Sequence, residues 1–371
     1  MPYIPTMPKN RIFPVITIAL LVPLAALAQA PGAPGGGTAP ATVPAAVVEP
    51  PTPEEVLLDA AIKKVAALKS VSAKITQKVE MLDQKFSVSG SYLKAPDYRV
   101  ALNLKVTGLA DAAGTMLQVC DGQTLWDYQQ ILDAQYYRKV DVGQVFEKLK
   151  SSELDADLKT AIFTQLGFAG PEALLVGLRK NVRFDQKETV TTDGKDYLVL
   201  KGAWKNRDGL LGPNQQPLPP TVKLPPYIPS LVVLTIGKDD GWPYKLRLVG
   251  QAQSMLMDTR KIGPDGRPIG ARSSIQEAPR TVIELTYTEV KLNPDLKIED
   301  FVFQAPPGAR VDDTTAQFVG MLDQAIQNNI ARKKAEASKA DDPLLKENLV
   351  VPRAGDVTPA PNPTAASAKP R

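Results

Sequence analysis

Residues 116–128 read Met116-Leu-Gln-Val-Cys-Asp-Gly-Gln-Thr-Leu-Trp-Asp-Tyr128. The Asp121-Gly122 step is a strong turn signal between two short runs of strand-forming residues, so it predicts an antiparallel hairpin of 116–120 with 124–128. Just before it, every second residue of 100–106 is apolar, which is the pattern of a strand with one buried face. Short strands joined by tight turns indicate an antiparallel meander.

The meander continues in both directions along the chain. Residues 71–81 alternate in the same way, and further strands are expected at 86–93, 136–142, 182–191, 197–204, 231–236, 244–251, 281–291 and 301–303. We summarise this as about ten strands, with a proline-rich loop at 206–229 and a Gly/Pro-rich excursion at 261–279. A curved antiparallel sheet of this size closes partly on itself.

Helices are expected before and within the meander. Thr52 is a suitable N-cap ahead of Pro53, and the helix that follows has an apolar face made of Val56, Leu57, Ala60, Ala61, Val65 and Leu68. Three more helical segments, 142–150, 154–166 and 171–178, interrupt the strands. The predicted class is α+β, a half-open antiparallel barrel whose helices form a lid over a hydrophobic cavity, plus a C-terminal helix.

The N-terminus has the features of a secretory signal at 1–28. Lys9 and Arg11 supply a positive region, 12–27 is apolar, and Ala26-Leu-Ala28 offers a cleavage site. An uncleaved membrane anchor is the alternative, but Pro14 and Pro23 disfavour a stable spanning helix. The sequence therefore predicts export, with no stable transmembrane span after processing.

The remaining chain divides by composition. Residues 29–53 form a Pro/Ala/Gly-rich linker, 54–313 the folded domain, 314–340 an amphipathic helix, and 341–371 a disordered Pro/Ala-rich tail. The apolar stripe of the helix is followed by Arg332, Lys333 and Lys334. This helix either lies on a membrane or partner, or packs back on the domain, and we favour packing.

Composition disfavours an enzyme. The 371 residues contain no histidine, the side chain whose charge changes near neutral pH. Cys120 is the single cysteine, which leaves no intrachain disulfide or cysteine-rich metal site, and its flanks predict a buried strand position. The net charge of +4 is scattered, so a nucleic-acid partner is not expected. The acidic stretch 239–243 is best explained as a hairpin turn. We expect no cofactor and no metal.

Four stretches occur in an order that resembles a known family. They are Ala66-Ala-Leu-Lys-Ser-Val-Ser-Ala-Lys-Ile-Thr-Gln-Lys-Val79, Gly90-Ser-Tyr-Leu-Lys-Ala-Pro-Asp-Tyr-Arg99, Cys120-Asp-Gly-Gln-Thr-Leu-Trp-Asp-Tyr128 and Phe301-Val-Phe-Gln-Ala-Pro-Pro-Gly-Ala-Arg-Val-Asp-Asp313. Over about 58–313 the chain resembles the periplasmic outer-membrane lipoprotein carrier (LolA-like) family. The resemblance implies a periplasmic carrier of an acylated lipoprotein or lipid, with inner- and outer-membrane acceptor proteins as partners. An envelope sensor on the same fold, without cargo transport, is the alternative.

The resemblance also suggests where a ligand and a lid contact lie. The family places an arginine before the strand-ending proline, where it holds the lid closed; here Ala95 precedes Pro96, so Lys94 or Arg99 would replace it as the lid latch. The residues that we expect to line the cavity share an inward position on the predicted strands: Leu102, Leu104, Val106, Leu117, Val119, Trp126 and Tyr128. The same pattern also fits ordinary core packing.

Overall fold

The computed structural model describes residues 50–340, except 82–83, 109–113, 169, 208–209, 211–217, 219–221, 226, 252, 258–260, 263–267, 270–273 and 279. The predicted signal segment, most of the predicted linker and the predicted tail lie outside the described residues, and these remain predictions. Among the described helices, none is long and apolar enough to cross a membrane.

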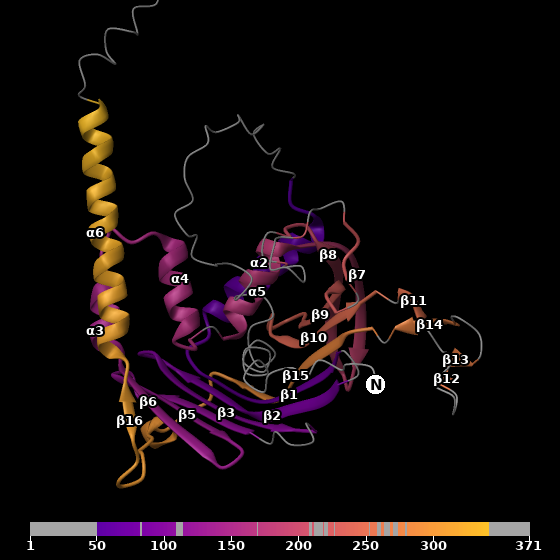
Figure 1. Cartoon of the computed structure of the whole chain (residues 1–371), viewed down its shortest axis with the longest axis horizontal. Coiled ribbons are helices and arrows are strands. Elements are labelled where there is room, and N and C mark those ends of the chain that lie inside the picture. The colour runs from indigo at the N-terminus through magenta and orange to yellow at the C-terminus, as the bar shows by residue number, and fades with distance from the viewer. Residues whose placement is uncertain are drawn as a thin grey trace, which may run out of the picture.

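The chain builds one large sheet of twelve strands in the order β16-β6-β5-β4-β3-β2-β1-β15-β10-β9-β8-β7 (Figure 1). The strands are β1 (Val71–Met81), β2 (Gln84–Ala95), β3 (Arg99–Thr107), β4 (Gly114–Cys120), β5 (Thr124–Ile131), β6 (Ala134–Asp141), β7 (Val182–Thr192), β8 (Lys195–Trp204), β9 (Pro229–Gly237), β10 (Pro243–Gly250), β15 (Val282–Leu292) and β16 (Val311–Asp313). Only the β16–β6 pair is parallel. The sheet curves but stays open, because β16 and β7 remain its two edges. The α+β class with an open, barrel-like sheet is confirmed.

Two details of the predicted strands are wrong. The main sheet has twelve strands rather than about ten, and the expected strand at 301–303 is absent from it: Ile298–Phe301 forms a 3₁₀ helix, η3, and the closing strand is β16. In addition, the excursion before β15 contains two small two-stranded sheets, β11 (Gln253–Met257) with β14 (Ser274–Ala278) and β12 (Lys261–Ile262) with β13 (Pro268–Ile269). Local composition did not reveal these short pairings, because each strand is only two to five residues long.

The described part of the chain has five α-helices on one side of the sheet (Figure 1). They are α2 (Pro53–Ala66), α3 (Val142–Leu149), α4 (Ala156–Gln165), α5 (Pro171–Asn181) and α6 (Thr315–Ala340). Two of them, α3 and α6, lie side by side at the β16 end of the sheet. The start of α2 follows the prediction: the Glu55 backbone N–H donates to Thr52 Oγ1 over 3.1 Å, and the Thr52 N–H donates to Glu55 Oε2 over 3.3 Å, which completes a capping box.

The apolar face predicted for α2 is confirmed at Ala61 and Val65, which are buried, and is wrong at Val56 and Ala60, which are exposed. Leu58 is fully buried, whereas Val56 is 54% exposed. Glu55 lies on the same buried face as Leu58, Ala61 and Val65, and its carboxylate is paired there with Arg179 and Lys205.

Helix α6 packs on the body of the protein over its first half. Leu322 is fully buried and Phe318 is 9% exposed, and both belong to the main core. Lys148 of α3 donates to Asp323 over 2.6 Å, and the Asn329 side-chain amide donates to the carbonyl oxygen of Glu153 over 2.5 Å. The helix is therefore attached to the segment between α3 and α4 as well as to the sheet.

Candidate functional site

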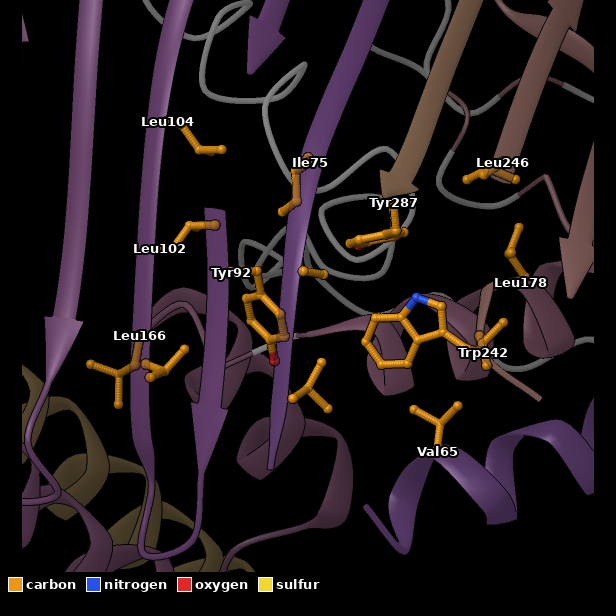
Figure 2. Packing of buried hydrophobic residues seen from close by; sticks show 14 of the residues in the cluster. Val65, Ile75, Tyr92, Leu102, Leu104, Leu166, Leu178, Trp242, Leu246 and Tyr287 are labelled. Atoms are coloured by element: carbon orange, nitrogen blue, oxygen red, sulfur yellow. The ribbon is translucent and has the colours of Figure 1, made fainter. Parts of the chain in front are cut away.

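The sheet has an inner face, which carries Leu102 and Leu104 and lies against the helices, and an outer face opposite it (Figure 2). Strand register extends the inner face sideways, because directly opposed residues share a face: Tyr92 is opposite Leu102, and Ile75 is opposite Tyr287. Each of these five side chains is less than 9% exposed. The inner face is thus a continuous apolar surface beneath the helices.

The register divides the predicted cavity-lining residues between the two faces. Leu102, Leu104 and Val106 are opposite Gln118, Met116 and Gly114, which places those three predicted residues on the inner face. The other four lie on the outer face: Leu117 is opposite Asn103, Val119 is opposite Ala101, and their partners on β5 are Tyr128 and Trp126. The expectation that all seven share one face is therefore wrong. Side chains alternate between the two faces along β3 and along β4, as predicted. Which residues of β4 share a face with Leu102 and Leu104 depends on the register of the two strands, and the alternation within one strand does not fix it.

The side chains of β4 and β5 that do face inward include a thiol. Cys120 is opposite Val100 and Leu125, and it is fully buried. Burial raises the pKa of the Cys120 thiol to about 11. Cys120 is therefore an apolar packing residue, as its flanking sequence predicts.

The outer-face residues form an aromatic cluster with Phe303. The Phe303 ring centroid lies 5.7 Å from that of Trp126, 6.3 Å from that of Tyr128 and 6.4 Å from that of Tyr137. These contacts hold Phe303, in the segment between β15 and β16, against the outer face of β5 and β6. Trp126 and Tyr128 thus pack between the sheet and this segment, and they do not face the helices.

Of the two predicted latch residues, one reaches a helix. Lys94 lies on the inner face, and its Nζ is 4.0 Å from Glu172 Oε2 in the first turn of α5. Arg99 instead stabilises the β2–β3 turn, where its Nε donates to the Pro96 carbonyl oxygen over 3.0 Å and its Nη2 lies 3.5 Å from Asp97 Oδ2. The structure therefore places Lys94 against a helix and Arg99 within its own turn.

A third residue of the same turn, which the sequence did not single out, makes more extensive contact with the helices. Tyr98 has a φ of 59°, in the left-handed region, and its ring centroid lies 4.2 Å from that of Phe146 in α3, 6.0 Å from Phe163 in α4 and 6.1 Å from Phe168. Asp97 also has a positive φ, so the turn is of the type that matches strand twist and usually contains glycine or asparagine. The sequence signal that could have identified Tyr98 is an aromatic residue at a turn position where glycine or asparagine is usual.

Charged side chains join α2, α5 and β8. Arg179 of α5 lies 3.4 Å from Glu55 and donates from Nε to Asp59 over 2.9 Å, while Lys205, directly after β8, donates to Glu55 over 2.9 Å. Burial opposes ionisation of Glu55, but the hydrogen bonds from Lys205 and Thr52 and the charges of Lys205 and Arg179 outweigh it, so the pKa of Glu55 lies below its ordinary value.

Replacing Glu55 with glutamine is expected to lower the free energy of unfolding at pH 7 by about 1–2 kcal/mol, since Arg179 and Lys205 lose their buried partner but keep some contact with water. The pKa of Glu55 is lower in the folded than in the unfolded protein. The additional stability of wild type is therefore fully present above the unfolded-state pKa of Glu55, and it is lost as the pH falls through the folded-state pKa. Urea unfolding from pH 7 down to about pH 3 measures this. Glu147→Gln, in a pair with both side chains 70% exposed, is the control. A difference that does not depend on pH contradicts the assignment.

The turn between β9 and β10 holds the C-terminal end of α2. Lys64 Nζ donates to the Asp239 carbonyl oxygen over 2.7 Å, and Gly241 lies so close to α2 that a Cβ there would sit 2.9 Å from Ala61 Cα. Asp240 accepts from Lys195 over 2.8 Å and from the Tyr244 hydroxyl over 2.8 Å. The acidic stretch is thus a hairpin turn, as predicted, and the structure adds an ion pair between Lys195 and Asp240.

The outer face also has a charged groove of about 480 Å³ lined by Lys78, Glu80, Arg247, Arg280, Val282 and Glu284. Glu284 is paired with Lys245 over 2.9 Å, and Glu80 with Lys85 over 3.3 Å. Its charged walls do not suit a hydrocarbon chain, so the inner face remains the candidate site.

Comparisons with known proteins leave the family open. No protein-family model and no curated protein match the chain. Among solved structures it is similar to a DUF1329 family protein from Desulfovibrio piger (10% identity, 67% of this chain, 97% of that chain, TM-score 0.26) and to LprF from Mycobacterium bovis (13%, 67%, 97%, 0.30). It also matches the Pseudomonas aeruginosa MucA/MucB complex structure (10%, 67% of this chain, 60% of that chain, 0.28). These sequence identities and TM-scores are too low to establish a shared fold, so the description of the architecture rests on the strand order and register given above.

Proposed function

We propose that this protein binds the acyl chain of a lipid or lipoprotein between the inner face of the sheet and the helices, and carries it through the cell envelope without catalysing a reaction. The supporting observation is the continuous apolar inner face, on which Leu102 and Leu104 are at most 2% exposed. Each methylene that moves from water to such a surface contributes about 0.8 kcal/mol, so an acyl chain gains enough to bind without a charged partner.

Binding requires the helices to move away from the sheet. The described structure is a closed state, because the inner-face side chains are covered. Side-chain contacts hold the middle of the helical layer: Lys94 with Glu172, the ring of Tyr98 with three phenylalanines, and Gln118 Nε2, which donates to the Leu166 carbonyl oxygen over 2.9 Å. These contacts can break without disrupting the strand ladder. The acceptors in this proposal are proteins of the inner and outer membranes.

The test is to purify the full chain from its native envelope without detergent and to analyse extracted lipids by mass spectrometry. We expect acyl lipid or acylated peptide to co-purify, or to be taken up by delipidated protein at about one chain per molecule. If the protein neither retains nor takes up any acyl compound, the proposal is wrong.

A binding module that senses a partner protein is the second candidate. Edge strand β7 supports it: on one side β7 pairs with β8, no described strand pairs with its other side, and its residues from 185 onward are exposed. Such an edge can accept an extended segment of another protein. In a Val190→Pro variant, loss of a partner with unchanged lipid uptake supports the module, whereas a partner that still binds with unchanged affinity contradicts it.

A further inference from the structure

Three polar groups beneath the helices, two on the inner face and one in the turn before β10, make no hydrogen bond among the described residues. Trp242 is 1% exposed, and its Nε1–H has no hydrogen-bond acceptor among the described residues. Tyr92 and Tyr287 are each 7% exposed, and no hydrogen bond of either hydroxyl is found within the described part of the chain, although only Trp242 Nε1 among the three groups is a fully enclosed donor. Buried donors of this kind are rare and require an explanation.

Strand register brings these groups together. Tyr92 is opposite Ala73 on one side of β1, and Tyr287 is opposite Ile75 on the other side. The rings of Trp242 and Tyr287 meet edge to face at 5.5 Å with an angle of 77°. In Figure 2, Trp242 lies between Tyr287 and Val65 of α2, with its nitrogen on the Tyr287 side, and the Tyr92 hydroxyl points toward the helices. Trp242 and Tyr287 are therefore in direct contact, and the Tyr92 hydroxyl lies nearer the start of α5, where a Cβ at Gly170 would clash with it.

The surroundings favour an uncharged ligand atom. All three side chains belong to the apolar core, and Val65, Leu178 and Leu246 lie around Trp242 (Figure 2). Burial raises the pKa of both tyrosines, so the two hydroxyls stay protonated and can donate. The charge of Lys94 is already compensated by Glu172. A ligand with a free carboxylate would therefore lose its hydration at this site without gaining a cationic partner.

We propose that Trp242, Tyr92 and Tyr287 donate hydrogen bonds to the carbonyl oxygen of an acyl ester or amide whose hydrocarbon chain lies along the inner face. This inference rests on the proposed function and specifies its ligand class: neutral acyl compounds rather than free fatty acids or plain hydrocarbons. Trp242 Nε1 has no access to solvent in the closed state, so the carbonyl reaches it only when α2 moves away from the turn at Gly241. The ligand then supplies the acceptor that the closed packing lacks.

The experiment compares three probes of equal chain length on the delipidated full chain: methyl palmitate, hexadecyl methyl ether and palmitate. Wild type is expected to bind the ester about tenfold more tightly than the ether. The Tyr92→Phe/Tyr287→Phe double variant and the Trp242→Phe variant keep the rings but remove the donors. Each is expected to reduce the preference for the ester several-fold and to leave ether binding unchanged. Tyr136→Phe, at a tyrosine that is 56% exposed, is the matched control.

Each outcome separates the two proposals. If wild type binds ester and ether equally, or if the variants lose both equally, the carbonyl site is wrong while the carrier stands. Tighter binding of palmitate than of its ester overturns the ligand class. If no probe binds at all, the proposed function fails as well. Thermal unfolding checks each variant, and if Trp242→Phe does not fold, the tyrosine variants decide, because removing unpartnered hydroxyls leaves the packing intact.

Discussion

Replacing Gly241 with alanine is expected to lower the free energy of unfolding by about 2–5 kcal/mol. Gly241 has a φ of +71°, which costs about 1–2 kcal/mol for any residue with a Cβ. The new Cβ would also lie 2.9 Å from Ala61 Cα, a backbone atom of α2, and relieving such overpacking costs about 1–3 kcal/mol more. Urea unfolding measures the total, and a red shift of tryptophan fluorescence reports whether the adjacent Trp242 becomes exposed.

The chain provides a matched control at Gly194. Its φ of +74° is nearly the same, but a Cβ there would meet no atom within 4 Å. Gly194→Ala should therefore show the backbone cost alone, about 1–2 kcal/mol, with no change in fluorescence. Equal losses for the two variants would mean that the β9–β10 turn does not hold α2.

Replacing Tyr98 with alanine is expected to lower the free energy of unfolding by about 2–3 kcal/mol and to loosen the helices over the inner face. The ring contacts Phe146, Phe163 and Phe168, and each aromatic pair contributes about 0.5–1.5 kcal/mol beyond the area that it buries. Because Tyr98 is 51% exposed, the burial contribution itself is reduced. Hydrogen exchange should become faster in α3 and α4, and delipidated protein should take up acyl compounds faster.

Two variants isolate the role of the Tyr98 ring. Tyr98→Phe keeps all ring contacts and should behave as wild type. Lys94→Ala breaks a partly exposed ion pair at 4.0 Å and is expected to change stability by less than about 1 kcal/mol. If Lys94→Ala increases exchange in the helices more than Tyr98→Ala does, the lysine rather than the tyrosine is the latch.

Local pattern was sufficient to predict most elements of this fold. The alternation in β1 and β3 and the Asp121-Gly122 turn are readable because one face of each strand is buried and the other is not. The helices α3 and α5 were equally clear from their spacing and from their position between strands. These features depend on residues that are close together in the sequence, so they can be predicted from a single sequence.

The candidate site could be predicted only in part, because its composition depends on long-range contacts. Trp126 and Tyr128 were correctly expected to share a face, but which face depends on strand parity across a connection and on the distant Phe303. Trp242 was recognised only as part of a turn, and its burial results from contact with α2 and β15. A turn residue has no periodicity that could reveal such a contact.

The most direct test of the account is photolabelling with a palmitoyl ester that carries a diazirine near the middle of its chain. The account predicts adducts on the inner face, at Leu102, Leu104 or Tyr287 and on the facing residues of α2 and α5, which excess unlabelled ester suppresses. Adducts confined to the outer cluster around Trp126 and Phe303, or labelling that competitor does not reduce, would contradict it.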